Sequence, residues 1–184
     1  MSALRWSFAA AVLALAAAAQ AELVNENLLV ELPPGYKIDF QQRKNNMLMT
    51  EMVPQGQSVN DWTEMVTVQI FFGHKATPEQ LKTNITHGWL AACRGGSYQK
   101  LSAAPQNGYE TLVWRLSCPL NPATRKPEMT WFKAVKGNDS LYVVQKAFKF
   151  APSDEQIATW MRFLDTVKAC DSRLPDRRCP QTKK

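Results

Sequence analysis

The stretch from Trp62 to Phe72 constrains the fold of this chain more than any other. It is rich in β-branched and aromatic residues, which favour a strand, and Gly73 ends it. Its alternating residues separate into an apolar face and a half-polar face. The apolar face holds Val66, Val68, Ile70 and Phe72, and the half-polar face holds Met65, Thr67, Gln69 and Phe71. The pattern predicts a central strand of an antiparallel sheet, with one side packed on the core and the other partly exposed to solvent.

Two helices are marked by their first residues. A Ser or Thr followed three residues later by Gln forms a capping box, and the chain has one at Thr77–Gln80 and another at Ser153–Gln156. Apolar residues repeat at helical spacing after each box. We expect the first helix to end near Cys93 and the second to run to about Ala169.

The other alternating or apolar runs predict the remaining strands of the sheet. They lie at residues 28–32, 36–40, 47–53, 98–104, 109–118, 129–135 and 141–150. Residues 119–127 contain three prolines and are expected to form a loop. In the last strand Lys146 and Lys149 alternate with apolar residues, which predicts a face in water. The fold class is therefore α+β, with a single mostly antiparallel sheet packed by two helices.

Residues 1–21 have the layout of a secretory signal peptide. Arg5 precedes an apolar run, and an A-x-A site ends at Ala21. The apolar run is about a dozen residues, too short to span a bilayer as a helix, although an uncleaved anchor is the alternative. The sequence thus predicts one domain over residues 22–170, a basic irregular tail over 171–184, and no transmembrane segment after cleavage. The expected location is the periplasm or the medium of a bacterium.

All four cysteines follow the signal segment. An even number of cysteines in an exported chain predicts two disulfides, for which three pairings are possible. We favour Cys93–Cys118 and Cys170–Cys179, because short loops close most readily and the second bridge would fasten the tail. A redox pair or a zinc site is not predicted, since the chain has no C-x-x-C motif and only two histidines. No cofactor is expected.

The basic charge does not by itself predict nucleic-acid binding. The full chain has a net charge of +6, and the signal segment removes one Arg and no acid, which leaves +5. From Asp171 onward five basic residues face two acidic ones, a net charge of +3, so the remaining body carries only +2. A short basic tail is more often a solvated terminus than a binding arm.

Few residues form a recognisable chemical motif. The sequence has no G-x-S-x-G, no H-E-x-x-H and no Gly-rich phosphate loop. Asp61 and Glu64 are three residues apart and are the candidates for carboxylate chemistry. A ligand-binding surface is the other hypothesis, and ordinary packing of the same side chains is its alternative. Its candidate residues are Trp62, Arg43, Lys44 and His74.

The order of the expected elements resembles the small α+β domains of the PsbP/Mog1-like group. The residues that carry the resemblance are the segment Leu28–Tyr36 with its Pro-Pro-Gly turn, the capped helix from Thr77 and the closing helix from Ser153. The resemblance implies a mostly antiparallel sheet packed by helices, and a non-enzymatic accessory or binding role. It assigns no functional residue to this chain, and the two cysteine pairs depart from the group.

We therefore expect an exported, non-enzymatic binding or accessory protein that acts on an envelope protein or a small ligand. One alternative is a cell-envelope hydrolase that uses Asp61 and Glu64. The other is a binder of anionic envelope surfaces through the tail from Asp171 to Lys184. The sequence does not specify the ligand or the oligomeric state.

Overall fold

The computed structural model describes residues 23–180, and it contains one seven-stranded sheet. The strand order is β2-β3-β4-β8-β7-β6-β5, and every pair of neighbours is antiparallel. The strands are β2 (Tyr36–Lys44), β3 (Met47–Pro54), β4 (Glu64–Phe72), β5 (Ser97–Ser102), β6 (Glu110–Asn121), β7 (Lys126–Lys136) and β8 (Ser140–Phe148). The predicted signal peptide, with its cleavage site at Ala21, lies outside the described residues, as do the last four residues of the tail.

The strand that the sequence marks as central lies inside the sheet. β4 pairs with β3 on one side and with β8 on the other, from Glu64 opposite Phe148 to Phe72 opposite Ser140. Val66 and Val68 on β4 are buried, as the apolar face predicts. The strand begins two residues later than expected, and Trp62 lies in the segment before it.

Both predicted capping boxes are present. Thr77 accepts a hydrogen bond from the main chain of Gln80 at the start of α1 (Pro78–Ala92), and Ser153 accepts one from Gln156 at the start of α2 (Asp154–Thr166). In each box, Oε1 of the Gln side chain also accepts a hydrogen bond from the main-chain N–H of the cap residue. Each cap contributes roughly 1 kcal/mol by satisfying main-chain donors that the first turn leaves unpaired.

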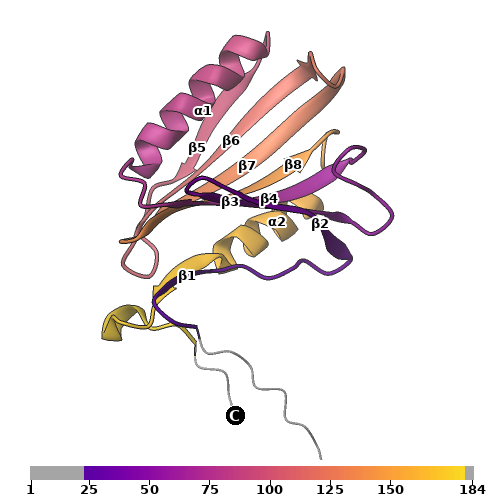
Figure 1. The fold of residues 1–184 in the computed structure, drawn as a ribbon. Helices are drawn as coiled ribbons and strands as arrows, with labels where there is room; N and C mark the ends of the chain where they lie inside the picture. Colours follow the sequence, from indigo (N-terminus) through magenta and orange to yellow (C-terminus); the bar gives the residue numbers. More distant parts are fainter. Residues whose placement is uncertain (1–22, 181–184) are drawn as a thin grey trace, which may run out of the picture.

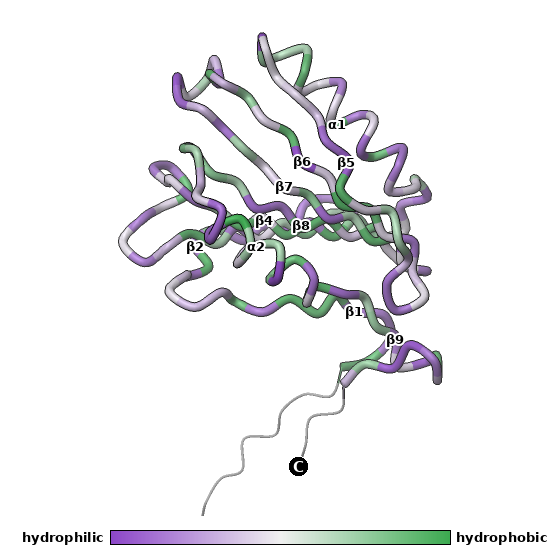
Figure 2. Tube along the Cα trace, turned by 180° about the vertical axis from the view of Figure 1, so that it is seen from behind, coloured by the Kyte–Doolittle hydropathy of each residue, from purple (hydrophilic) through white to green (hydrophobic). Residues whose placement is uncertain are grey.

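The two helices lie on opposite faces of the sheet (Figure 1). α1 packs against β6, β7 and β8, where Trp114 and Phe132 stack with ring centroids 4.9 Å apart. α2 packs against β4 and β8, where the buried residues include Val66, Val144 and Phe148. Figure 2 shows hydrophobic residues (green) alternating with hydrophilic ones along the strands. The predicted fold, a mostly antiparallel sheet packed by two helices, is confirmed.

The predicted cysteine pairing is also found. Cys93 at the end of α1 is bonded to Cys118 on β6, and Cys170 is bonded to Cys179. No cysteine in the described part of the chain is free. The second bridge fastens the C-terminal segment, as the sequence predicted, and the first ties α1 to the strand beneath it.

The C-terminal segment is more ordered than the sequence predicted. α2 ends at Thr166 instead of Ala169, and the next residues form β9 (Lys168–Asp171). β9 pairs with β1 (Glu26–Leu29) as a small two-stranded sheet, and a short 3-10 helix, η1 (Pro175–Arg177), follows it. The helical pattern of the sequence continues past Thr166, but the strand partner supplied by β1, far away along the chain, ends the helix early.

The predicted loop over residues 119–127 is confirmed only at 122–125, which form a turn, and is wrong at its two ends. β6 continues to Asn121 and β7 begins at Lys126, so Pro119 and Pro127 lie within strands. The pairing of β6 with β5 begins at Ser117, which leaves the end of β6 without a neighbour on that side. A proline is tolerated there because no ladder hydrogen bond is required of its nitrogen. Within residues 23–180, no helix has the length and hydropathy of a membrane span.

Candidate functional site

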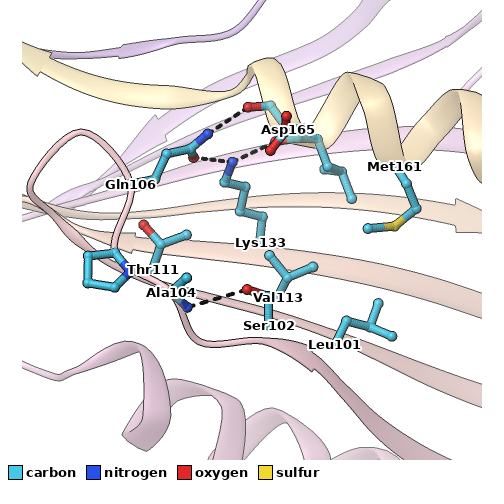
Figure 3. Close-up of a pocket in the computed structure, with 11 residues that line it drawn as sticks. Leu101, Ser102, Ala104, Gln106, Thr111, Val113, Lys133, Met161 and Asp165 are labelled. Carbon is cyan, nitrogen blue, oxygen red and sulfur yellow. Dashed lines mark hydrogen bonds between the residues drawn. The ribbon is translucent and has the colours of Figure 1, made fainter.

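The candidate site is a pocket between α2 and the part of the sheet formed by β5 and β6. Its volume is about 250 Å³. Its apolar lining residues are Leu101, Ala104, Pro105, Val113, Met161 and Leu164, and its polar ones are Ser102, Gln106, Thr111, Lys133 and Asp165. Figure 3 shows that Leu101, Val113 and Met161 lie at one end of the pocket and that Gln106 and Lys133 meet beneath Asp165 at the other.

Two local features of the chain build this pocket. A bulge between Lys100 and Ser102 shifts the register of β5, the edge strand that borders the pocket. The β5–β6 hairpin then turns at Asn107 and Gly108, both with positive φ, which is the geometry of a two-residue turn. The turn brings Gln106 to the end of α2, where its amide donates a hydrogen bond of 2.7 Å to the carbonyl of Asp165. The Asn-Gly hairpin turn thus forms one end of the pocket.

Lys133 is the chemically distinctive residue of the pocket. It rises from β7 and is only 3% exposed. Its Nζ donates hydrogen bonds to the carbonyl of Leu164 (2.7 Å) and to Oε1 of Gln106. An ammonium group has three donors, so the described residues leave one donor for a ligand. Burial lowers the pKa of Lys133 to about 8, although the charge of Asp165 acts in the opposite direction.

Lys133 was not predicted from the sequence as a site residue. The signal that was available is its neighbourhood: Trp131, Phe132, Ala134 and Val135 make an apolar run on both sides of the lysine. All four of these residues are buried. A strand that is apolar on both faces is covered on both faces, so a lysine within it is expected to be buried and to need partners.

A second buried lysine corrects a prediction. Lys146 was expected to face water, but it is fully buried beneath α2. Its Nζ lies 2.6 Å from the hydroxyl of Tyr36 and 2.8 Å from Oε2 of Glu64. The same nitrogen is 3.6 Å from the ring centroid of Trp160 and 4.4 Å from that of Phe148. The alternation along β8 could not reveal this, because α2 covers the face that the pattern assigned to water.

Burial lowers the pKa of Lys146 to about 8, and its hydrogen bond to Glu64 opposes that shift. For Tyr36, burial and the neighbouring Glu64 carboxylate raise the pKa above its ordinary value. The three polar groups satisfy one another inside the core. We therefore interpret this cluster as part of the packing between α2 and the sheet.

The two carboxylates proposed for hydrolysis lie in different surroundings. Oε2 of Glu64 accepts hydrogen bonds from Tyr36 and Lys146. Asp61 is exposed, and its main chain pairs with Ser58 in a turn. Neither carboxylate lines the Lys133 pocket. Among the described residues, no group of three or more His, Cys, Asp or Glu side chains could hold a metal ion.

The structure brings together three of the four residues of the predicted ligand surface. Lys44 and His74 line a shallow pocket of about 370 Å³ together with Phe71 and Phe72. The guanidinium of Arg43 lies 4.7 Å from the ring centroid of Phe72. Trp62 precedes the opposite end of β4, roughly 26 Å away along the strand. There Nζ of Lys149 lies over its ring, 3.7 Å from the centroid.

In the described part of the basic tail, two arginines contact groups of the same chain. Arg173 pairs with Asp171 and Asp139, each at 2.6 Å. The guanidinium of Arg177 lies over the ring of Tyr109, 4.6 Å from its centroid. Lys183 and Lys184 lie outside the described residues. These contacts hold the tail against the domain.

The chain was compared with known proteins by sequence and by structure. No family model matches it, and no curated protein sequence matches it. Among solved structures, the fold is similar to that of a mutant of protein Mog1, with a TM-score of 0.42 and 11% sequence identity. The superposition covers 76% of this chain and 85% of that chain. The similarity is a distant one of fold.

Proposed function

We propose that this chain is an exported, non-enzymatic binding protein whose Lys133 pocket takes a small carboxylate with an aliphatic chain. The observation that carries the proposal is a nearly fully buried ammonium group at one end of a pocket with apolar walls. An apolar pocket with a few placed polar groups is the usual form of a small-molecule site. The third donor of Lys133 would bind the carboxylate, and Leu101, Val113 and Met161 would contact the chain.

The charges around the pocket favour a ligand with a single negative charge. Lys133 provides one positive charge at the buried end, where a hydrogen bond to a carboxylate is strengthened by low local polarity. Asp165 also lines the pocket, and it would repel a second negative charge on the ligand. The pocket lining contains no His or Cys, and its one serine, Ser102, accepts a hydrogen bond from the main chain of Ala104. These features support binding rather than turnover.

Binding of hexanoate tests this function. We expect the wild-type protein to bind hexanoate more tightly than the neutral hexanamide, and Lys133→Met to lose about 10- to 100-fold in affinity for hexanoate. A hydrogen bond to a charged group is worth about 1.5–3 kcal/mol, and each 1.4 kcal/mol is tenfold. Calorimetric titration measures both affinities, and the circular dichroism of the variant shows whether it is folded.

The matched control for this titration is Lys168→Met. Lys168 is exposed and close enough to lower the pKa of Lys133, so its removal tests the general positive field near the pocket. We expect the affinity of this variant for hexanoate to change little. Equal binding by the wild type and by folded Lys133→Met, or equal binding of acid and amide, would contradict the proposed site.

Export is the second part of the proposal. Two disulfides in a chain of this kind are typical of an oxidising compartment. We expect the chain, expressed with its own leader in a bacterium, to be recovered outside the cytoplasm with Glu22 as its first residue. Intact-mass measurement and N-terminal sequencing of the fractions check this prediction. A cytoplasmic product that retains Met1 would argue against export.

Membership of the PsbP/Mog1-like group remains a prediction. It is supported by the order of the elements, with the Pro-Pro-Gly turn that ends at Gly35 before β2 and a capped helix after β4. The roles of Asp61 and Glu64 in hydrolysis, and of the tail in surface binding, have no comparable support from contacts within the described residues.

A further inference from the structure

Two methionine sulfur atoms converge on one point of the sheet, away from the Lys133 pocket. Met47 and Met49 are two residues apart on β3, so both side chains lie on the same face. Met47 pairs with Phe71 and Met49 pairs with Gln69 on β4. This is the face on which Phe71 packs against the cluster beneath α1.

The amide nitrogen of Gln69 contacts both thioethers. Its Nε2 is 3.9 Å from Sδ of Met47 and 3.8 Å from Sδ of Met49. Both methionines and Gln69 are only partly buried. Met47 also lines the shallow pocket that contains His74. Both sulfur atoms therefore contact the same amide nitrogen.

The neighbouring Gln145 makes the amide of Gln69 usable as a ligand. Nε2 of Gln145 donates a hydrogen bond of 2.8 Å to Oε1 of Gln69. The two amides form a pair that can reverse together, because each has both a donor and an acceptor. After that reversal Oε1 of Gln69 would face the two sulfur atoms. The arrangement then offers two thioether sulfurs and one amide oxygen.

We propose that Met47 and Met49 form a binding site for a soft monovalent metal ion, of the class of Cu(I) and Ag(I). Thioether sulfur is a soft ligand and selects such ions over hard ones. Thiolates would compete for them, but each cysteine in the described part of the chain is in a disulfide. Glu51 follows Met49 on the same face, and Lys44 pairs with Met47. One acidic and one basic side chain thus flank the site, so its selectivity rests on the sulfur atoms.

Silver ion is the appropriate probe, because it needs no reductant that would open the disulfides. In the protein labelled with [¹³C-methyl]methionine, we expect Ag⁺ to shift the methyl resonances of Met47 and Met49 at one equivalent. Native mass spectrometry should show one bound ion. The double variant Met47→Leu with Met49→Leu should lose the ion, because this change conserves volume but removes both sulfur ligands.

Two further variants make the test specific. Met129→Leu is the matched control, since Met129 packs on the opposite face of the sheet against the α2 cluster, and we expect it to bind Ag⁺ like the wild type. His74→Ala should retain binding as well. Unshifted Met47 and Met49 methyl resonances at saturating Ag⁺ would overturn the proposal. Binding that survives in the double variant and disappears in His74→Ala would also overturn it.

Discussion

Replacing Glu64 with Gln is expected to lower the free energy of unfolding by about 3–5 kcal/mol. The carboxylate of Glu64 is the negative partner of Lys146, which is fully buried and surrounded by the rings of Trp160, Phe148 and Tyr36. Without that carboxylate a positive charge remains in the core with no counter-charge. The cost is that of an uncompensated buried ion, which is larger than the net contribution of the ion pair itself.

Urea denaturation of the Glu64→Gln variant measures this effect. Asp61→Asn is the matched control, because Asp61 is an exposed carboxylate three residues away, and its loss should change stability by no more than about 0.5 kcal/mol. The double variant Glu64→Gln with Lys146→Met should recover much of the loss, since it removes both charges. A Glu64→Gln protein as stable as Asp61→Asn would show that Lys146 is not buried as an ion.

Stability is expected to rise with pH between about 8 and 10. The folded protein holds Lys133 and Lys146 with pKa values of about 8, whereas the ordinary value is 10.5. In this window the folded state has released protons that the unfolded state still binds, and stability therefore rises with pH. Both lysines are almost fully buried, so each contributes on the order of 3 kcal/mol over the whole window.

Two tyrosines end this rise at high pH. Burial raises the pKa of Tyr36 and of Tyr142 above 10, and nearby Glu64 and Glu26 act in the same direction. Above pH 10 the unfolded state ionises these tyrosines while the folded state keeps their protons, so stability falls again. Urea denaturation at pH 7, 8.5, 9.5 and 11 should show a maximum. Lys146→Met should lose part of the rise, and stability that is flat or falling from pH 8 to 9.5 would contradict the assignment.

Features of the fold that depend on local sequence could be predicted. Thr77–Gln80 and Ser153–Gln156 are capping boxes that satisfy donors within one turn, so their geometry follows from residues three apart. The turn at Asn107 and Gly108 similarly follows from two residues that tolerate positive φ. The cysteine pairing could be predicted because short loops close most readily. The fold places the sulfur atoms of both predicted pairs at bonding distance.

Features that depend on distant segments could not be predicted from the sequence. Lys146 has the spacing of a residue in water, and only the position of Trp160 on α2 reveals that it is buried. β9 follows helical residues and forms a strand because β1 lies beside it. Pro119 can lie within β6 because β5 does not extend far enough to pair with it, so no hydrogen bond from its nitrogen is needed. In each case the deciding partner is remote in sequence.

The candidate site falls between these two cases. Gln106 precedes the Asn107–Gly108 turn, whose residues tolerate positive φ, and Lys133 belongs to a strand whose apolar neighbours indicate burial. The packing of α2 decides that Lys133 meets Gln106 and the carbonyl of Leu164 at one end of a pocket. No local pattern specifies that contact. The residues of the predicted ligand surface are likewise not all together. Trp62 precedes the first residue of β4, whereas Lys44 and His74 lie at the other end of this strand.

A crystal structure of the protein grown with hexanoate tests the proposed function most directly. The carboxylate is expected within hydrogen-bonding distance of Nζ of Lys133, and the chain against Leu101, Val113 and Met161. At a hexanoate concentration that saturates binding in solution, a pocket without the ligand, or a ligand bound elsewhere with Lys133 unchanged, would contradict the proposal that this pocket is the binding site.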